Sequence, residues 1–319
     1  MRAMEVARFC STSHVMIVAG KGGVGKTTVT AALALTAARA GLSVLIVEVE
    51  GKSGLTAAFG APDLEYEETT LAERVRARTI TADAALVDYL HGHGMRRISK
   101  RLATSGALDV VATAVPGMND ILALGKVKSL EEQRAADLVL VDAPAAGHAV
   151  SFLLSARGLL DAVRVGPVRK QAADVVEMLG DGTRCQVVLV TQPEETPVAE
   201  LVDTAFAIED RAGVALGPVV VNGCYEPLPP GLPRSAEAIV HDATLVDRFV
   251  SEREAADLAR AAAFREERHA VQREQADRLA SLLPLPQLRL PFLFTAGIGR
   301  PELDVLAASL SAAIAELPA

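Results

Sequence analysis

The chain has 319 residues, and half of them are hydrophobic, which is enough apolar material for a large folded core and excludes a disordered chain. A formal net charge of −8, without a long run of Lys or Arg, argues against an extended nucleic-acid surface. The three cysteines are widely separated, as is typical of a reducing compartment, and no uncharged apolar run is long enough to span a membrane. We therefore expect a cytoplasmic protein with no nucleic-acid partner and no stable membrane insertion.

The first predicted elements are a buried strand, a glycine-rich loop and a helix. Residues 1–13 lack the apolar core of a signal peptide, and we interpret them as an irregular start. Val15–Ala19 is rich in β-branched residues, as is typical of a strand covered on both faces. Gly20–Thr27 fits the spacing G-x-x-x-x-G-K-[ST], and Thr27–Arg39 is helical in pattern, with Gly41 placed to end that helix.

This order of strand, loop and helix is the context in which such a loop binds nucleotide phosphates. Glycines allow several backbone N–H groups to point at one anion, and the helix N-terminus adds a partial positive charge. We expect Lys26 to contact the β- and γ-phosphates and Thr27 to ligate Mg²⁺. The predicted nucleotide-binding residues of the loop are Gly20, Gly22, Gly23, Val24, Gly25, Lys26, Thr27 and Thr28.

A second lysine, Lys21, stands at the first variable position of this loop. The run Gly-Lys-Gly-Gly-Val-Gly-Lys-Thr-Thr resembles the deviant Walker A motif of the signature-lysine ATPases, which include the ArsA (arsenite-pump) and tail-anchored-protein-targeting (Get-type) ATPases. In that class two subunits or halves face each other across ATP, and the first lysine contacts the partner's nucleotide. The resemblance implies an ATP-dependent dimer with a catalytic Lys21; solvated surface charge is the alternative.

Leu42–Val47 predicts a second buried strand, which runs into Glu48 and Glu50. Alternation along an extended chain places both carboxylates on one side, near the phosphate loop, because ligands bind beyond the carboxyl ends of strands in doubly wound sheets. The segment from Leu45 to Gly51 resembles switch I of the ArsA and targeting ATPases, in which an aspartate orients the attacking water. The resemblance implies that Glu50 is catalytic, with a longer side chain that would slow hydrolysis.

A helical block is predicted after a short strand at Arg76–Thr81. It contains one helical run that starts at Asp83 and another over Asn119–Gln133. Val115–Asp120 resembles a Pro-Gly-x-x-Glu segment in the inserted helical lobe of the ArsA and targeting ATPases. We therefore interpret residues 83–134 as an inserted helical subdomain, which either binds a hydrophobic protein client or simply packs on the core.

Leu138–Asp142 has four apolar strand-forming residues followed by an aspartate, the Walker B arrangement that holds Mg²⁺. Residues 142–148 resemble switch II of the same family, Asp-Thr-Ala-Pro-Thr-Gly-His, although the proline is displaced by one position and both threonines are lost. The resemblance implies that Asp142 is catalytic and shares the metal with Thr27. It also implies that His148 couples the γ-phosphate to the helical lobe.

The C-terminal half predicts more strands and the base-binding residues. Strands are expected at Ala162–Val165 and Gln186–Pro193, then a helix at Pro197–Arg211 and a strand that ends near Asn222. An Asn amide after a buried strand can pair with adenine, and the family keeps an adenine-contacting Asn at this place; a turn-forming Asn is the alternative.

The last part of the chain predicts long helices and one strand. Residues 243–283 read as one or two charge-rich helices in a solvated outer layer, and Pro301–Leu317 as a closing helix. Between them lies a strand at Leu288–Phe292. In the family the loop after this strand closes over the adenine, so Pro291 and Phe292 are candidate base contacts.

These patterns predict an α/β fold, with a doubly wound, mostly parallel sheet of the P-loop type in a single ATPase domain over 1–319. The resemblance implies ATP and Mg²⁺ as cofactors and a homodimer, or a heterodimer with a paralogous ATPase. Our leading hypothesis is a slow ATPase whose closure holds a hydrophobic peptide or protein client. Its rival is a poorly hydrolysing structural subunit that pairs with a catalytic paralogue.

Overall fold

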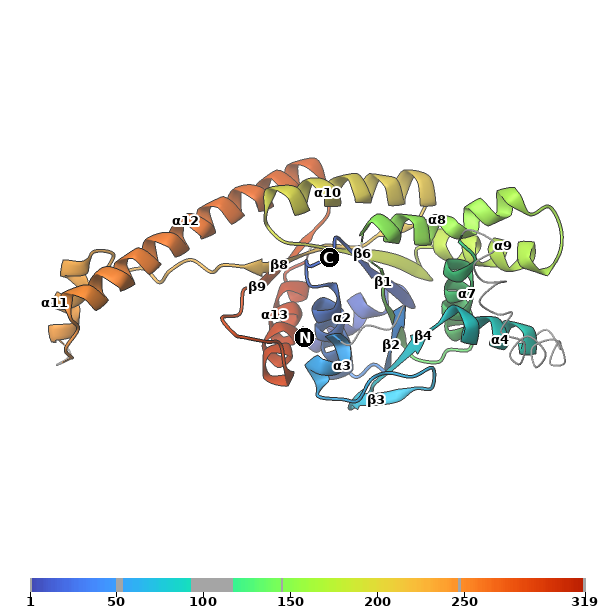
Figure 1. The fold of residues 1–319 in the computed structure, drawn as a ribbon, viewed down its shortest axis with the longest axis horizontal. Coiled ribbons are helices and arrows are strands. Elements are labelled where there is room, and N and C mark those ends of the chain that lie inside the picture. Colours follow the sequence, from blue (N-terminus) through green and yellow to red (C-terminus); the bar gives the residue numbers. More distant parts are fainter. Residues whose placement is uncertain (1, 50–53, 93–116, 145, 246–247, 318–319) are drawn as a thin grey trace.

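A mostly parallel sheet runs through the middle of the protein (Figure 1). The computed structural model describes residues 2–49, 54–92, 117–144, 146–245 and 248–317. The strands are β1 Val15–Ala19, β2 Val44–Val49, β3 Thr69–Ala72, β4 Val75–Ile80, β5 Leu138–Asp142, β6 Cys185–Thr191, β7 Ala215–Leu216, β8 Val219–Cys224 and β9 Gln287–Pro291. Their order is β3-β4-β2-β5-β1-β6-β8-β9, with β7 beside β6. Among the strands of the described ranges, only β3 and β4 pair antiparallel, so the predicted fold class is confirmed.

Helices cover both faces of the sheet (Figure 1). One face carries α1 Arg2–Cys10, α2 Lys26–Arg39, α3 Gly54–Phe59 and α13 Arg300–Ala315. The other carries α4 Ala82–Gly92, α7 Met118–Glu132, α8 Ala146–Ala162, α9 Pro167–Gly180 and α10 Glu195–Phe206, which continues into the π-helical turn η1 Ala207–Ala212. The predicted helices after the loop, at 119–133 and at 197–211, correspond to α2, α7 and α10 with η1.

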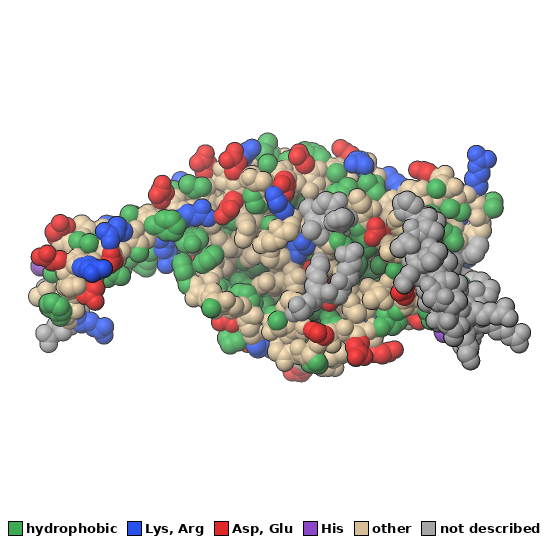
Figure 2. Space-filling view, viewed as in Figure 1, with side chains coloured by type: hydrophobic (Ala, Val, Ile, Leu, Met, Phe, Trp, Pro, Cys, Tyr) green, Lys and Arg blue, Asp and Glu red, His purple; other side chains and the backbone are tan. Residues whose placement is uncertain are grey.

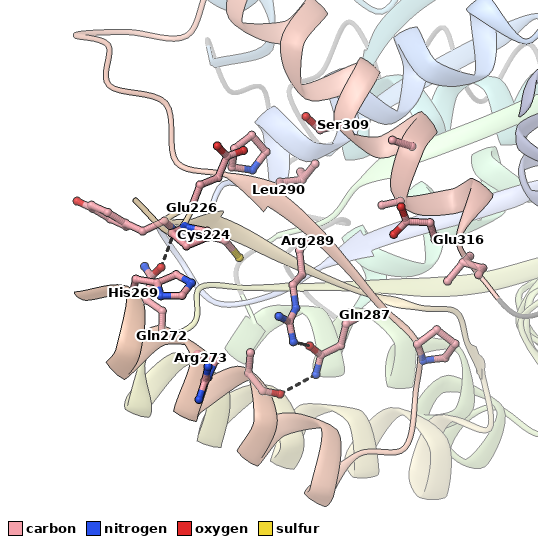
Figure 3. Close-up of a pocket in the computed structure, with 18 residues that line it drawn as sticks. Cys224, Glu226, His269, Gln272, Arg273, Gln287, Arg289, Leu290, Ser309 and Glu316 are labelled. Atoms are coloured by element: carbon pink, nitrogen blue, oxygen red, sulfur yellow. Dashed lines mark hydrogen bonds between the residues drawn. The ribbon is translucent and has the colours of Figure 1, made fainter. Parts of the chain in front are cut away.

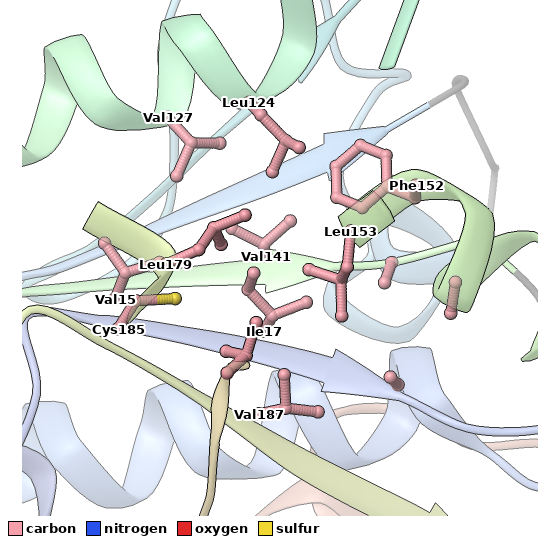
Figure 4. Close-up of a cluster of buried hydrophobic side chains, with 14 of the residues drawn as sticks. Val15, Ile17, Leu124, Val127, Val141, Phe152, Leu153, Leu179, Cys185 and Val187 are labelled. Atoms are coloured by element: carbon pink, nitrogen blue, oxygen red, sulfur yellow. The ribbon is translucent and has the colours of Figure 1, made fainter. Parts of the chain in front are cut away.

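Two apolar clusters fill the space between the sheet and these helical layers. Successive side chains of a strand point to opposite faces, so Val15 and Ile17 of β1 join one cluster while Met16 and Val18 join the other. Figure 4 shows the first cluster, in which Ile17 lies close to Leu153 of α8, and Val15 lies beside Cys185 and Leu179. Burial on both faces explains why the central strands are continuous apolar runs in the sequence.

The predicted charge-rich region forms α11 Ala236–Leu245 and α12 Glu252–Leu282. A capping box starts α12, since the Ser251 hydroxyl accepts from the Glu254 N–H and the Glu254 carboxylate accepts from the Ser251 N–H. The helix is 31 residues long, and its first half extends past the edge of the sheet with α11 at its tip (Figure 1). Acidic and basic side chains are interspersed along α11 and the first half of α12, which together form an arm (Figure 2). The long helices are confirmed, but only the second half of α12 forms an outer layer over the sheet.

Two predictions from the sequence are wrong. Residues 162–165 are not a strand, because α8 continues to Ala162 and the next residues form a surface turn in which Val165 is 82% exposed. The start of the chain is not irregular either, since residues 2–10 form α1, whose Val6 and Cys10 lie one helical turn apart and are buried. Within the described ranges, no helix is both long enough and apolar enough to cross a membrane.

Candidate nucleotide-binding site

The glycine-rich loop lies at the carboxyl ends of the central strands, between β1 and α2. Its two outer glycines are required by close packing. A Cβ on Gly20 would collide with the carbonyl oxygen of Val190 in β6, and a Cβ on Gly25 would collide with the Asn222 amide nitrogen. Gly25 also has a φ of +94°, a conformation that other residues rarely adopt. The loop therefore forms a backbone cradle without side chains at its ends, as phosphate binding requires.

Lys26 projects into the curve of its own loop. The residue is 8% exposed, and its Nζ donates a hydrogen bond to the carbonyl oxygen of Lys21 at 3.1 Å. The ammonium is therefore held beside the backbone groups that the sequence assigns to phosphate. This position supports the predicted contact with the β- and γ-phosphates.

Thr27 and Asp142 meet at this site, although they are 115 residues apart in the chain. The Thr27 hydroxyl in the first turn of α2 donates to Asp142 Oδ2 at the end of β5, at 2.6 Å. Asp142 is fully buried, because β5 lies between β2 and β1 in the centre of the sheet. A hydroxyl and a carboxylate are hard oxygen ligands of the kind that Mg²⁺ prefers, so the pair fits the predicted metal.

Glu48 is a further carboxylate at the same place. It is 2% exposed near the end of β2 and pairs in register with Asp142 of β5. Strand alternation places both side chains on the α2 face, since their neighbours Ile46 and Leu140 belong to the cluster on that face. The sequence placed Glu48 near the loop but did not show that it adjoins Asp142. Glu50, the predicted switch I acid, lies outside the described residues.

Asn222 contacts the phosphate loop directly. Its Nδ2 donates to the carbonyl oxygen of Val24 at 2.9 Å, across 198 residues of chain. The observed contact therefore braces the loop, a role that the sequence did not predict. It uses the amide nitrogen and leaves the role of the amide oxygen towards adenine as a prediction.

Lys21 forms an ion pair within its own chain. Its Nζ lies 2.6 Å from Oε1 of Glu200 on α10, and the two side chains are 39% and 44% exposed. Sequence reasoning did not find Glu200, because a single glutamate on a helix 179 residues away carries no local signal. The predicted contact of Lys21 with a partner's nucleotide stays a prediction.

The predicted base contacts, Pro291 and Phe292, lie at the end of β9 beside two other aromatic rings. Phe292 stacks on Tyr225 with 4.9 Å between ring centroids, and Phe294 meets Phe292 edge-on at 5.0 Å. Gly223, next to Asn222, lies against the Phe292 ring. These three rings, the aromatic cluster, therefore continue the site from the loop towards β9. Tyr225 and Phe294 were missed, although aromatic residues make up only 3% of the chain and three of them occur here.

A cavity of about 730 Å³ lies on the outer side of β9, the edge strand, and shares Tyr225 and Pro291 with the site (Figure 3). Helices α12 and α13 form its walls, with His269 and Arg273 on α12 and Ser309 on α13. None of its lining residues belongs to the phosphate loop. Cys224 reaches this cavity, and burial raises the pKa of its thiol to about 11, so the thiol stays protonated at neutral pH.

The two described helices of the predicted lobe, α4 and α7, are joined by a polar network. The hydroxyl of Tyr66 and the ammonium of Lys126 on α7 both donate to Asp88 Oδ2 on α4, at 2.6 and 2.5 Å. Burial pushes the pKa of Asp88 up, but these two hydrogen bonds outweigh it and hold the pKa below its usual value. Residues 93–116 lie outside the described ranges, as does the side chain of His148, so the lobe at 83–134 and the coupling role of His148 stay predictions.

Comparison with known proteins agrees with this geometry. Residues 13–164 match the family model described as anion-transporting ATPase, ArsA type. The chain is 38% identical to ATPase BagA of Mycobacterium tuberculosis over 227 residues, which are 65% of this chain and 64% of that protein. It is 30% identical to ATPase get3 of Schizosaccharomyces japonicus over 139 residues, which are 43% of this chain and 42% of that protein. The matched part thus spans slightly less than two thirds of the length of the first relative.

The sheet order, the loop and the Thr27–Asp142 pair define a P-loop nucleotide-binding protein. Within that class, the chain is similar to the ArsA/Get-type ATPases, the family that its motifs resemble. The matched residues, 13–164, include the loop and both predicted switch regions.

Proposed function

We propose that this protein binds ATP with Mg²⁺ at the Gly20–Thr27 loop, hydrolyses it slowly and acts as a dimeric nucleotide-dependent switch. The observation that carries the proposal is the hydrogen bond from Thr27 Oγ1 to Asp142 Oδ2. It brings together, from a helix and a distant strand, the two side chains expected to hold Mg²⁺ directly and through water. The relatives' names, which include the word ATPase, support the same activity.

Each residue of the site has a distinct role in this proposal. The loop glycines present backbone N–H groups to the phosphates, and Lys26 exchanges its bond to the Lys21 carbonyl for phosphate oxygens. Thr27 and Asp142 hold the Mg²⁺, which offsets the charge that develops on the phosphates. Glu50 orients the attacking water, and Glu48 adds a second buried carboxyl group beside Asp142 at the carboxyl ends of the strands.

The dimer is proposed on the resemblance of the loop together with the exposure of Lys21. The partner is a second copy of this chain or a paralogous ATPase, and each Lys21 would contact the nucleotide of the other subunit. The partly exposed Lys21 side chain is able to reach a partner at this surface. A hydrophobic peptide or protein client at residues 83–134 completes the leading hypothesis.

Single-turnover phosphate release from ATP·Mg²⁺, with binding measured by calorimetry, tests this function. We expect measurable release from the wild type. Lys26→Ala should lose tight binding, because the phosphates lose their main cationic partner. Glu50→Gln should bind ATP normally but release phosphate at least about tenfold more slowly. Lys170→Ala, which removes an exposed lysine on α9, is the matched control and should behave as the wild type.

The same measurements separate the two hypotheses. Unchanged ATP·Mg²⁺ affinity in Lys26→Ala would contradict the site itself. Tight ATP binding by the wild type, with no release above that of Glu50→Gln, would instead favour the poorly hydrolysing subunit. Equal and fast phosphate release by wild type and Glu50→Gln would show that Glu50 is not the switch acid. It would point to Glu48, the described glutamate at the end of β2.

A further inference from the structure

Lys21, which is proposed to contact the partner's nucleotide in the dimer, is ion-paired with Glu200 of its own subunit. We propose that Glu200 is a positioning residue that holds Lys21 within its own subunit and thereby opposes closure of the dimer. This inference rests on the proposed function, because it concerns the contact between Lys21 and the partner's nucleotide. It adds a residue on α10 that determines how readily that contact forms.

Glu200 is presented by a firmly anchored helix, whereas Lys21 belongs to a loop. Val198, Leu201 and Ala205 of α10 are buried in the apolar cluster beneath the helix. The start of α10 is also tied to the arm helix α12, because Arg268 lies 2.7 Å from Glu194. The backbone that carries Glu200 is thus anchored, and the Lys21 side chain, with its flexible four-carbon stem, is the longer partner of the pair.

The ammonium of Lys21 cannot serve both contacts. At 2.6 Å from Glu200 Oε1 it lies at the distance of a charge-assisted hydrogen bond, so reaching a phosphate on another subunit requires that this bond break. Dimer closure therefore exchanges one Lys21 contact for another. A nucleoside triphosphate carries more negative charge than one carboxylate, so its phosphates are able to replace Glu200 as the contact of Lys21.

The size of the effect follows from the exposure of the pair. Both side chains are partly exposed, and exposed ion pairs shift an equilibrium by at most about fivefold. A two-fold symmetric dimer would break two such pairs, so the dimerisation constant changes by up to about 25-fold. Salt screens an exposed pair, and the effect should shrink at high ionic strength.

Sedimentation velocity with a non-hydrolysable ATP analogue and Mg²⁺ provides the test. We expect Glu200→Gln to lower the dimer dissociation constant by about 2- to 25-fold relative to wild type at low salt, and by clearly less in about 0.5 M salt. Glu200→Asp, which keeps the charge, should lie between the two. Asp203→Asn removes an exposed carboxylate from the same helix and should leave the constant unchanged.

A second readout follows Lys21 itself. An amine-reactive label, located by peptide mass spectrometry, should modify Lys21 faster in nucleotide-free Glu200→Gln than in wild type, since the pair no longer shields the ammonium. If Glu200→Gln dimerises as strongly as wild type or more weakly, the inference about Glu200 is wrong, but the proposed dimer still stands. Absence of nucleotide-dependent dimers in every variant, with ATP binding retained, would instead refute the dimer and this inference together.

Discussion

Replacing Asn222 tests how the phosphate loop is held in shape. Asn222→Ala removes the amide that donates to the Val24 carbonyl at 2.9 Å, and one hydrogen bond of this kind is worth about 0.5–1.5 kcal/mol net. If the bond stabilises the loop in its binding shape, its loss reduces phosphate affinity by about 2- to 13-fold. The Gly25 backbone, packed against the same amide, would lose a contact as well.

Calorimetry with three Mg²⁺ complexes distinguishes bracing of the loop from recognition of the base. We expect Asn222→Ala to weaken ATP, GTP and inorganic tripolyphosphate by a common factor, because all three present phosphates to the loop. Any further loss confined to ATP measures pairing of the amide with adenine, the role that the sequence predicts. Asn119→Ala, the same substitution at an exposed position of α7, is the control. Unchanged tripolyphosphate affinity in Asn222→Ala would refute the bracing argument.

Two further predictions concern stability. Phe152→Ala should lower the free energy of unfolding in urea by about 3–5 kcal/mol, because the ring is fully buried. Phe249→Ala, at a 92% exposed residue, should change it by less than about 0.5 kcal/mol. Similar losses in the two variants would contradict the assigned core. Asp88 has a folded-state pKa below its unfolded value, so its contribution is present above the unfolded pKa, about 3.9, and is lost as the pH falls through the folded pKa. Acid titration of unfolding should therefore show a shallower loss of stability below about pH 4 in Asp88→Asn than in wild type, and coincident curves would exclude that contribution.

The elements predicted correctly are those whose signal is local. A strand covered on both faces must be a continuous apolar run, so β1, β5 and β6 are visible in the sequence. Gly41 at a φ of +97° ends α2 as its position predicts. The run at 162–165 misled because two valines in four residues do not reveal whether other elements cover them. The amphipathic α1 was missed because its buried face packs on distant residues, and β3 was missed because its four partly exposed residues form no apolar run.

In the candidate site, too, the features with a local sequence signal were predicted, and the contacts between distant residues were not. The cradle and Lys26 lie in one stretch of chain, so their spacing alone predicts them, and Asp142 follows from the end of an apolar strand. The contacts of Asn222 with Val24 and of Glu200 with Lys21 depend on how β8 and α10 are placed against the loop. A motif fixes residue types over short distances, but it carries no information about which distant side chain packs against it.

The phosphate loop packs against residues of β6 and β8, so it cannot change shape without affecting these strands. Gly20 packs against the Val190 carbonyl of β6, and Val24 accepts from Asn222 of β8, so two strands on the same side of β1 hold the loop. β6 leads into α10 with Glu200, and β8 leads into the aromatic cluster at Tyr225. Closely packed interiors transmit small displacements instead of absorbing them. A change in the shape of the loop would therefore act on α10, which holds Lys21, and on the rings beside the predicted base contacts.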